Sequence, residues 1–244
     1  METAEYQKMD RAEDHLWWYR SLHAYLTQAL LNSRAPVDAP ILDAGCGSGG
    51  LLRALGSVTP GRQRIGLERF EPVAARAREK SGAMIVVGTV DALPFQDNSF
   101  GAIFSADVLY HRNVDPGLAM RESFRCLKPG GLMLINVPAF QWLSSYHDQR
   151  VHGVRRFSRR ELKQMFASAG FSLPVLHYWN SLLFPVMVAR RMRPASANAA
   201  SDVEPLPGFL DTSLGAIVSV ERNLIRMGLR FPAGGSILGL AYKP

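Results

Sequence analysis

Cysteine is scarce in this chain, and its scarcity argues against two kinds of stabilised fold. The only cysteines among the 244 residues are Cys46 and Cys126. They belong to no Cys-x-x-Cys pair and to no Cys/His grouping with the spacing of metal ligands. The sequence therefore indicates neither a disulfide framework nor a structural zinc or other metal site. The sparing use of cysteine predicts a cytoplasmic protein.

Long hydrophobic runs are also missing. A membrane-spanning helix needs about 20 apolar residues, whereas the longest run here, 182–189, is interrupted by Pro185. The first residues are acidic and no apolar segment follows them, so the sequence predicts no secretory signal. Hydrophobic residues make up 47% of the chain, which is enough for a sizeable core. We expect one domain with additions.

Acidic residues are outnumbered by basic ones, which gives a formal net charge of +7. The charges are unevenly distributed, with acidic side chains concentrated in residues 1–14 and arginines in 150–163 and 190–193. Such basic stretches are compatible with nucleic acid, with an anionic membrane surface or with an acidic small substrate. They are equally compatible with solvated surface arginines, so charge alone leaves the partner open.

Glycine is concentrated where an apolar run ends. Residues 41–44 lead through Asp43 into the turn 45–50, Gly-Cys-Gly-Ser-Gly-Gly, and leucines at helical spacing follow. This order predicts a strand, a tight turn and a helix, which together form the first βα unit of a nucleotide-binding sheet. Glycines permit positive φ and a close approach of the backbone to a ligand. The ligand is expected at the carboxyl end of the strand.

Two acidic residues bear on the class of nucleotide ligand, and one of them distinguishes between the classes. Asp43 precedes Gly45 by two positions, where a pyrophosphate would meet a fixed negative charge and a cationic ligand would be stabilised. Glu68 ends a second short strand, 64–68, and is placed to accept ribose hydroxyls. Glu68 suits NAD and S-adenosylmethionine alike, whereas Asp43 favours the cationic cofactor.

The following motifs complete a family pattern. A third strand is expected at 83–87, and the motif Gly88–Phe95 follows it. A fourth strand, 100–105, is followed by a helix that begins at Asp115-Pro116. The turn Lys128-Pro129-Gly130-Gly131 then leads into a fifth strand, 132–137. In order and spacing, residues 39–138 resemble the class I S-adenosylmethionine-dependent methyltransferases, specifically their small-molecule, type 11-like branch. The resemblance implies an α/β, Rossmann-like, doubly wound sheet of seven strands with an antiparallel last strand.

The same resemblance implies a set of contacts with S-adenosylmethionine. Asp43, Gly45 and Gly47 would line its methionine and ribose side. Glu68 would hold the ribose hydroxyls. Asp91, Ala92 and Leu93 would lie beside the adenine.

An amphipathic helix is expected ahead of the sheet, over residues 12–31, because Trp18, Leu22 and Leu26 recur at intervals of four. Its aromatic start, 15–20, supplies either core anchors or the walls of a pocket. In related methyltransferases such a helix covers the cofactor. Trp18 and Arg20 are therefore candidates for the methionine end, where Arg20 could pair with the carboxylate.

Candidates for acceptor binding lie in two loops. His111, in the loop 107–112 after the fourth strand, is the candidate general base, since an imidazole titrates near ~6.5; the alternative is a structural histidine. The long connection 139–157 is aromatic and basic, which favours a functional segment over disorder. Arg155 and Arg156 could bind an anionic group, and His147 or His152 could replace His111 as base. The predicted substrate-binding residues are Tyr110, Tyr146, His147, His152, Arg155 and Arg156.

The last part of the chain contains an insertion of about fifty residues. A capping box, Ser158 to Glu161, begins a helix that Gly170 ends; strands are expected at 171–179 and 236–242. Between these strands, 182–189 runs into arginines, as an interfacial segment would, although we favour a buried helix at the sheet edge. A second helix is expected at about 211–227. Glu221 on its apolar face requires a partner, either an arginine or a polar substrate group.

The chain is thus expected to consist of an N-terminal helical cap (1–38), a methyltransferase core (39–180 and 231–244) and an insertion or lid (181–230). The expected function is S-adenosylmethionine-dependent methyl transfer to a small or amphiphilic molecule, at oxygen. The aromatic start and the segment 178–185 resemble bacterial enzymes that modify natural products, saccharides or lipids. The insertion could also contact a membrane peripherally.

Three alternatives are weighed against this function. An NAD(P)-dependent oxidoreductase conflicts with Asp43 and lacks a Tyr/Lys pair near the hydride. A nucleic-acid substrate is not expected, because the chain has no Pro-Pro-aromatic motif, no Pro-Cys nucleophile and no RNA-binding module. A non-catalytic protein that retains the cofactor is the third alternative.

Overall fold

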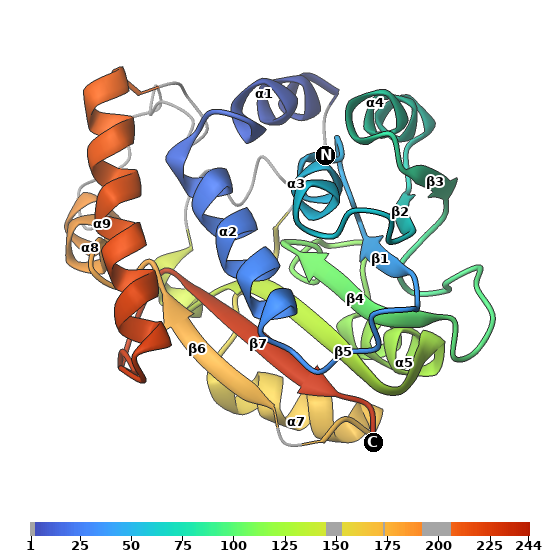
Figure 1. Cartoon of the computed structure of the whole chain (residues 1–244). Helices are drawn as coiled ribbons and strands as arrows, with labels where there is room; N and C mark the ends of the chain where they lie inside the picture. Colours follow the sequence, from blue (N-terminus) through green and yellow to red (C-terminus); the bar gives the residue numbers. More distant parts are fainter. Residues whose placement is uncertain (1–2, 145–152, 173, 192–205) are drawn as a thin grey trace.

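The computed structural model describes residues 3–144, 153–172, 174–191 and 206–244. A seven-stranded sheet with the order β3-β2-β1-β4-β5-β7-β6 forms its centre (Figure 1). β7 is antiparallel to β5 and β6, and the other neighbouring strands are parallel. The predicted seven-stranded Rossmann-like sheet with an antiparallel last strand is confirmed. The strands are β1 Ile41–Ala44, β2 Arg64–Glu68, β3 Met84–Val87, β4 Phe100–Ala106, β5 Leu127–Pro138, β6 Val175–Trp179 and β7 Ser236–Tyr242.

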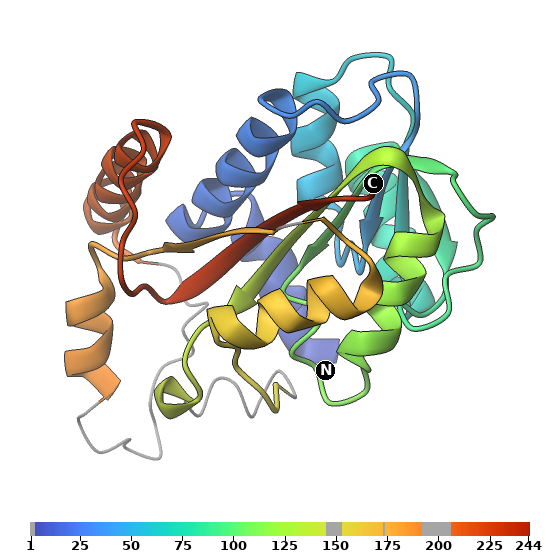
Figure 2. The same ribbon diagram turned by 90° about the horizontal axis from the view of Figure 1, so that it is seen from below.

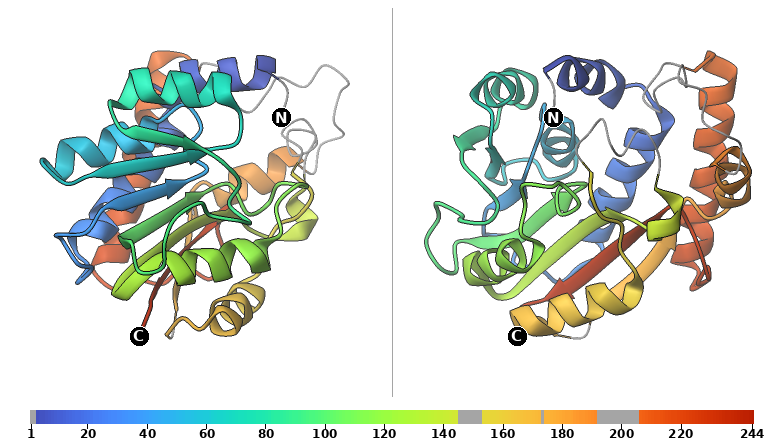
Figure 3. Two further views of the ribbon diagram at one scale, coloured as in Figure 1. Left: turned by 90° about the vertical axis from the view of Figure 1, so that its right-hand side faces the viewer. Right: turned by 180° about the vertical axis from the view of Figure 1, so that it is seen from behind.

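Helices cover both faces of the sheet. The helices are α1 Thr3–Glu13, α2 Trp17–Leu31, α3 Gly50–Val58, α4 Glu71–Ser81, α5 Pro116–Cys126, the short 3-10 helix η1 Gln141–Leu143, α7 Arg159–Ala169, α8 Phe184–Arg191 and α9 Gly208–Arg226. α2 and α3 pack on one face, and α9 packs against α2. α5 and α7 pack together on the other face (Figures 2 and 3). Each face therefore has its own apolar core.

The helix termini follow from local sequence. The Asp115 side chain accepts hydrogen bonds from the amides of Gly117 (2.8 Å) and Leu118 (3.0 Å), so α5 begins with an N-cap and a proline in its first turn. Ser158 and Glu161 form the predicted capping box of α7. Gly170 ends α7 with a φ of 98°, a conformation that favours glycine.

Three predicted boundaries are wrong. The helix expected over 12–31 begins only at Trp17, as α2, and residues 12–13 belong to the end of a separate helix, α1, that was not predicted. The fifth strand begins at Leu127, five residues earlier than predicted, because the Lys-Pro-Gly-Gly segment falls within β5 rather than ending α5. The sixth strand is confined to 175–179, since only this part pairs with β7.

The insertion differs from the favoured prediction. The apolar segment around 182–189 forms α8, but no residue of α8 is buried, so the expected buried helix at the sheet edge is wrong. α9 packs against α2 through its inner side, where Val218 and Glu221 are buried. Within the described residues, no helix combines the length and apolar character required to cross a bilayer.

Candidate active site

The glycine-rich turn lies between β1 and α3 and has two distinct sides. Gly45 has a φ of 93°, and a Cβ at this position would collide with the side chain of Val108, which follows β4. Gly47 has a φ of 52°, and a Cβ there would meet no atom within 4 Å. The turn is therefore closely packed at Gly45 and open at Gly47, so a ligand can approach the backbone on the Gly47 side.

Asp43 provides a buried carboxyl group at the end of β1. Asp43 is only 2% exposed. Burial, together with the nearby carboxylates of Glu13 and Glu68, raises the pKa of Asp43 to about 8. A pyrophosphate would add negative charge to three acidic groups, whereas a cation would relieve their repulsion. The turn thus fits a cationic ligand.

Glu68, at the end of β2, is held by backbone amides. One of its oxygens, Oε1, accepts hydrogen bonds from the amides of Arg69 (2.8 Å) and Phe70 (3.1 Å), and Oε2 accepts one from Gly47 (3.1 Å). The hydroxyl of Tyr6, on α1, is also hydrogen-bonded to this carboxylate. Burial raises the pKa of Glu68 and the backbone hydrogen bonds oppose the rise. Glu68, the residue expected to bind the ribose, is therefore held beside the turn.

The acidic start of the chain attaches α1 to the core. The ammonium group of Lys80, whose side chain is 2% exposed, forms ion pairs with Glu13 (2.8 Å), Asp10 (3.1 Å) and Asp14 (3.2 Å). Glu13 also accepts hydrogen bonds from the Gly50 amide (3.1 Å) and from the Ser48 hydroxyl. α1 consequently lies over α3 and α4 beside the turn (Figure 1). Sequence reasoning missed Tyr6, Glu13 and Lys80, and the cluster of acids in residues 1–14 was the available signal.

The predicted adenine contacts lie after β3. The Asp91 carboxylate accepts a hydrogen bond from the amide of Asp115 (3.2 Å), and burial raises its pKa. Leu93 is buried in the core, and its amide donates to Glu122 (2.9 Å). Ala92 is exposed. Roles for these three residues toward adenine remain predictions.

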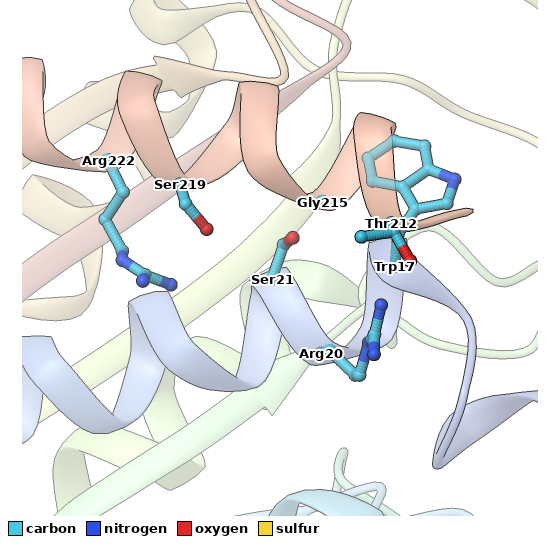
Figure 4. A pocket seen from close by; sticks show the side chains of 7 residues that line it. All are labelled: Trp17, Arg20, Ser21, Thr212, Gly215, Ser219 and Arg222. Carbon is cyan, nitrogen blue, oxygen red and sulfur yellow. The ribbon is translucent and has the colours of Figure 1, made fainter. Parts of the chain in front are cut away.

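Trp18 and Arg20 make contacts that connect α2 to its surroundings. The Trp18 ring lies 5.8 Å from that of Trp179 on β6. The Arg20 guanidinium forms an ion pair of 2.6 Å with Asp211 on α9. Arg20 also lines a cavity of about 190 Å³ between α2 and α9 (Figure 4). Their contact with the methionine end of a cofactor stays a prediction.

The carboxyl ends of β4, β5 and β6 point the same way and form one edge of the sheet, which we call the strained edge. Each strand is followed within two residues by a non-glycine residue with positive φ: Asp107 (55°), Phe140 (58°) and Asn180 (55°). Such conformations cost energy and are concentrated at functional sites. This edge adjoins β1, which carries Asp43, so it is the place where an acceptor could meet a bound cofactor.

Asp107 is a half-buried carboxyl group at this edge that sequence reasoning did not single out. Its Oδ2 accepts a hydrogen bond from the Asn136 amide nitrogen (2.9 Å), and the Asn136 oxygen accepts one from the Trp179 indole (2.8 Å). Because an indole can only donate, Trp179 fixes the orientation of the Asn136 amide. Burial raises the pKa of Asp107 to about 7, against the lowering effect of Asn136 and Arg156.

The loop that carries His111 lies beside the connection after β5. His111 forms an isolated β-bridge with Gly153, and its ring lies 4.4 Å from that of Tyr110. Arg156 is buried, and its guanidinium donates a hydrogen bond to the Ala139 carbonyl (3.1 Å). Arg155 is half-buried in the same segment. The structure therefore brings together the two loops predicted to bind the acceptor.

Three of the predicted acceptor residues, Tyr146, His147 and His152, lie outside the described residues. The prediction for Glu221 is wrong. Its carboxylate accepts hydrogen bonds from the amides of Ser181 (2.7 Å) and Leu182 (2.9 Å) and from the Tyr25 hydroxyl (3.4 Å). Backbone amides and a tyrosine thus replace the expected arginine or substrate group.

Comparison with known proteins identifies the family. A family model described as a methyltransferase domain matches residues 42–135, which include the turn, Asp43, Glu68 and Asp107. A protein of Encephalitozoon cuniculi provisionally named a methyltransferase is 31% identical over 163 residues, which cover 66% of this chain and 67% of that protein. The chain belongs to the S-adenosylmethionine-dependent methyltransferases. Its cofactor is S-adenosylmethionine, which the residues around the turn fit.

Other relatives of this methyltransferase match over shorter shares of their length. A probable S-adenosylmethionine-dependent methyltransferase of Mycolicibacterium smegmatis is 30% identical over 66% of the chain and 62% of that protein. A 24-methylenesterol C-methyltransferase 2 of Oryza sativa is 29% identical over 48% of the chain and 34% of that protein. The chain thus spans less than two thirds of the length of these two relatives.

Solved structures share the fold of the methyltransferase. The methyltransferase in a complex with the Haloferax volcanii activator Trm112 has a TM-score of 0.65 and 24% identity, and covers 99% of this chain and 95% of that one. Geranyl diphosphate C-methyltransferase of Streptomyces coelicolor has a TM-score of 0.59 and 16% identity, and covers 91% of this chain and 77% of that one. At these identities the likeness establishes the fold alone.

Proposed function

We propose that the protein transfers a methyl group from S-adenosylmethionine to an oxygen of a small or amphiphilic molecule, such as a natural product, a lipid or a saccharide. The observation that carries the proposal is the buried Asp43 carboxyl group beside the open side of the glycine turn. Relatives named for a sterol and for geranyl diphosphate support an acceptor with an apolar body. When bound, the cofactor supplies an electrophilic methyl group.

The residues around the turn would hold the cofactor. Asp43 would face its ammonium end, and Glu68 would accept the ribose hydroxyls. Asp91, Ala92 and Leu93 would lie along the adenine. Trp18 and Arg20 would reach the methionine carboxylate, provided that Arg20 exchanges its pairing with Asp211 for the ligand.

The strained edge would bind the acceptor. His111 would take the proton from the acceptor hydroxyl as the oxygen–carbon bond forms and the methyl–sulfur bond breaks, with S-adenosylhomocysteine as the leaving group. Asp107, held in place by Asn136, would accept a hydrogen bond from a second polar group of the acceptor and so orient the reacting hydroxyl. Arg155 and Arg156 would attract an anionic end, and Tyr110 would contact the apolar body.

The stacked aromatic rings beyond this edge suit such an apolar body. The rings of Phe140 and Tyr178 are stacked with centroids 5.2 Å apart, and Phe184 lies 5.7 Å from Phe140. Trp142, which is largely exposed, contacts the same group. Aromatic side chains with an apolar face and few polar groups are typical of small-molecule sites.

Transfer of a radiolabelled methyl group tests the proposal. The protein is incubated with labelled S-adenosylmethionine and matched pairs of amphiphiles that differ only in a hydroxyl or an amino group. We expect label in the hydroxylated compounds, as an ether. Label only in the amines would overturn the assignment to oxygen, and bound cofactor without transfer to any compound would favour a non-catalytic protein.

A further inference from the structure

Exposed hydrophobic side chains are concentrated on the insertion between β6 and β7. Among the described residues, eighteen large hydrophobic side chains are exposed, and nine of them lie between Leu182 and Leu229. α8 and α9, which carry most of these, lie together at the β6 end of the sheet (Figures 1 and 2). An exposed apolar surface of this extent marks a place where another molecule binds.

α9 presents an apolar stripe along its outer side. Phe209, Val220 and Met227 are 71%, 55% and 77% exposed. Intervals of eleven and seven residues correspond to about three and two turns, so the three side chains lie on one side of the helix. The stripe from Phe209 to Met227 is about 27 Å long at about 1.5 Å per residue. Val218 and Glu221, on the other side, are buried. α9 thus has an apolar stripe on its outer side in addition to the side that packs against α2.

The charges around this stripe are positive. Arg190 on α8 and Arg226 and Arg230 near the end of α9 are exposed. The acidic residues described between 182 and 230 are Asp211, which is paired with Arg20, and Glu221, which is buried and bonded to backbone amides. Neither of these acidic residues neutralises the positive charge of the exposed arginines. Exposed apolar side chains beside unbalanced arginines are complementary to the headgroups and acyl chains of an anionic bilayer.

A second copy of the chain fits this surface less well. A symmetric dimer places the same patch on both subunits, so it would bring together two surfaces with the same unbalanced positive charge. We infer that the outer face of α8 and α9 docks on the surface of an anionic phospholipid bilayer, with Phe209, Val220 and Met227 at the acyl-chain boundary and the arginines at the headgroups. Docking does not depend on the proposed methyl transfer, but it would give the enzyme access to an amphiphilic acceptor in the membrane.

Cosedimentation of the full chain with vesicles tests the inference. Two vesicle types are compared, pure phosphatidylcholine and phosphatidylcholine with about a third phosphatidylglycerol. We expect binding to the anionic vesicles in low salt and weak binding to the neutral ones. The triple variant Phe209→Gln, Val220→Gln and Met227→Gln should bind about tenfold more weakly or worse, since it removes the inserted apolar surface. Arg226→Gln with Arg230→Gln should weaken binding about fivefold for each arginine.

A control variant separates this face from general surface hydrophobicity. Val37→Gln with Met84→Gln changes two side chains that are exposed elsewhere, at 80% and 57%, and should bind like wild type. All variants are first compared with wild type by thermal unfolding. Wild type that fails to bind anionic vesicles in low salt, or a triple variant that binds equally well, would overturn the inference. Self-association that the triple variant abolishes, without vesicle binding, would identify an interface between copies instead. The assay contains no cofactor, so its failure is distinct from failure of the proposed methyl transfer.

Discussion

The Tyr6 hydroxyl of α1 is hydrogen-bonded to the Glu68 carboxylate, the group predicted to hold the cofactor ribose. A carboxylate offers about four acceptor positions, and three backbone amides already donate to Glu68. Tyr6 thus takes up the remaining position. The Tyr6 ring also packs edge-on against Phe70, with centroids 5.8 Å apart. A ribose hydroxyl that binds Glu68 must therefore displace the Tyr6 hydroxyl.

Tyr6→Phe should tighten the binding of S-adenosylhomocysteine by about tenfold or more, because it removes a competing hydrogen bond to a charged group, worth about 1.5–3 kcal/mol, and keeps the ring against Phe70. Isothermal titration measures the change. Glu68→Gln is the matched variant on the other partner, and it should weaken binding by about 1.5–3 kcal/mol. Equal or weaker binding by Tyr6→Phe would mean that the hydroxyl does not compete with the ligand.

His111→Ala should lower turnover by about 10²–10⁴-fold, the range for losing a general base, and leave cofactor affinity unchanged. Steady-state rates and a parallel titration with S-adenosylhomocysteine separate the two effects. Turnover within a few fold of wild type would assign the proton to another group or to none. His147→Ala and His152→Ala, measured in the same assay, would then distinguish these cases.

Asp107 should make the protein less stable as the pH rises. Its pKa is about 7 in the folded chain, and the unfolded chain releases the proton near ~4. Between these values the folded state holds the extra proton, so the contribution of Asp107 to the free energy of unfolding falls with a slope of at most about 1.4 kcal/mol per pH unit. Urea unfolding of wild type and Asp107→Asn at several pH values measures the difference. Parallel curves for the two proteins would contradict a raised pKa at Asp107.

Local sequence patterns predict most of the fold and the positions of two acidic groups, Asp43 and Glu68, beside the glycine turn. The turn at Gly45 to Gly50, the caps at Asp115 and Ser158 and the strand 236–242 each depend on residues close together in the chain. Glu68 and Asp43 could be found for the same reason, since each ends an apolar strand. None of these features depends on contacts between residues that are far apart in the chain.

The remaining features depend on contacts between distant parts of the chain. Lys80 explains the acidic residues of α1, and Trp179 orients Asn136 across the neighbouring β7, but neither pairing has a local signal. Glu221 was expected to require an arginine or a polar substrate group, because the amides at 181 and 182 become available only where β6 has ended beside α9. The apolar composition of α8 did not reveal its exposure, since a buried helix and an interfacial helix share that composition.

In the proposed cofactor site, Asp43 would bind the cationic end of S-adenosylmethionine at the glycine turn. Its pKa of about 8 means that the carboxyl group is mostly protonated below this pH and ionised above it. Titration of S-adenosylhomocysteine into wild type and Asp43→Asn, at about pH 6.5 and about pH 8.5, tests this directly. Wild type should bind more tightly at the higher pH. The variant should bind more weakly by about 1.5–3 kcal/mol and lose most of the pH dependence. Equal affinity and equal pH dependence in the two proteins, or tight binding of NADH with no heat from S-adenosylhomocysteine, would contradict the claim.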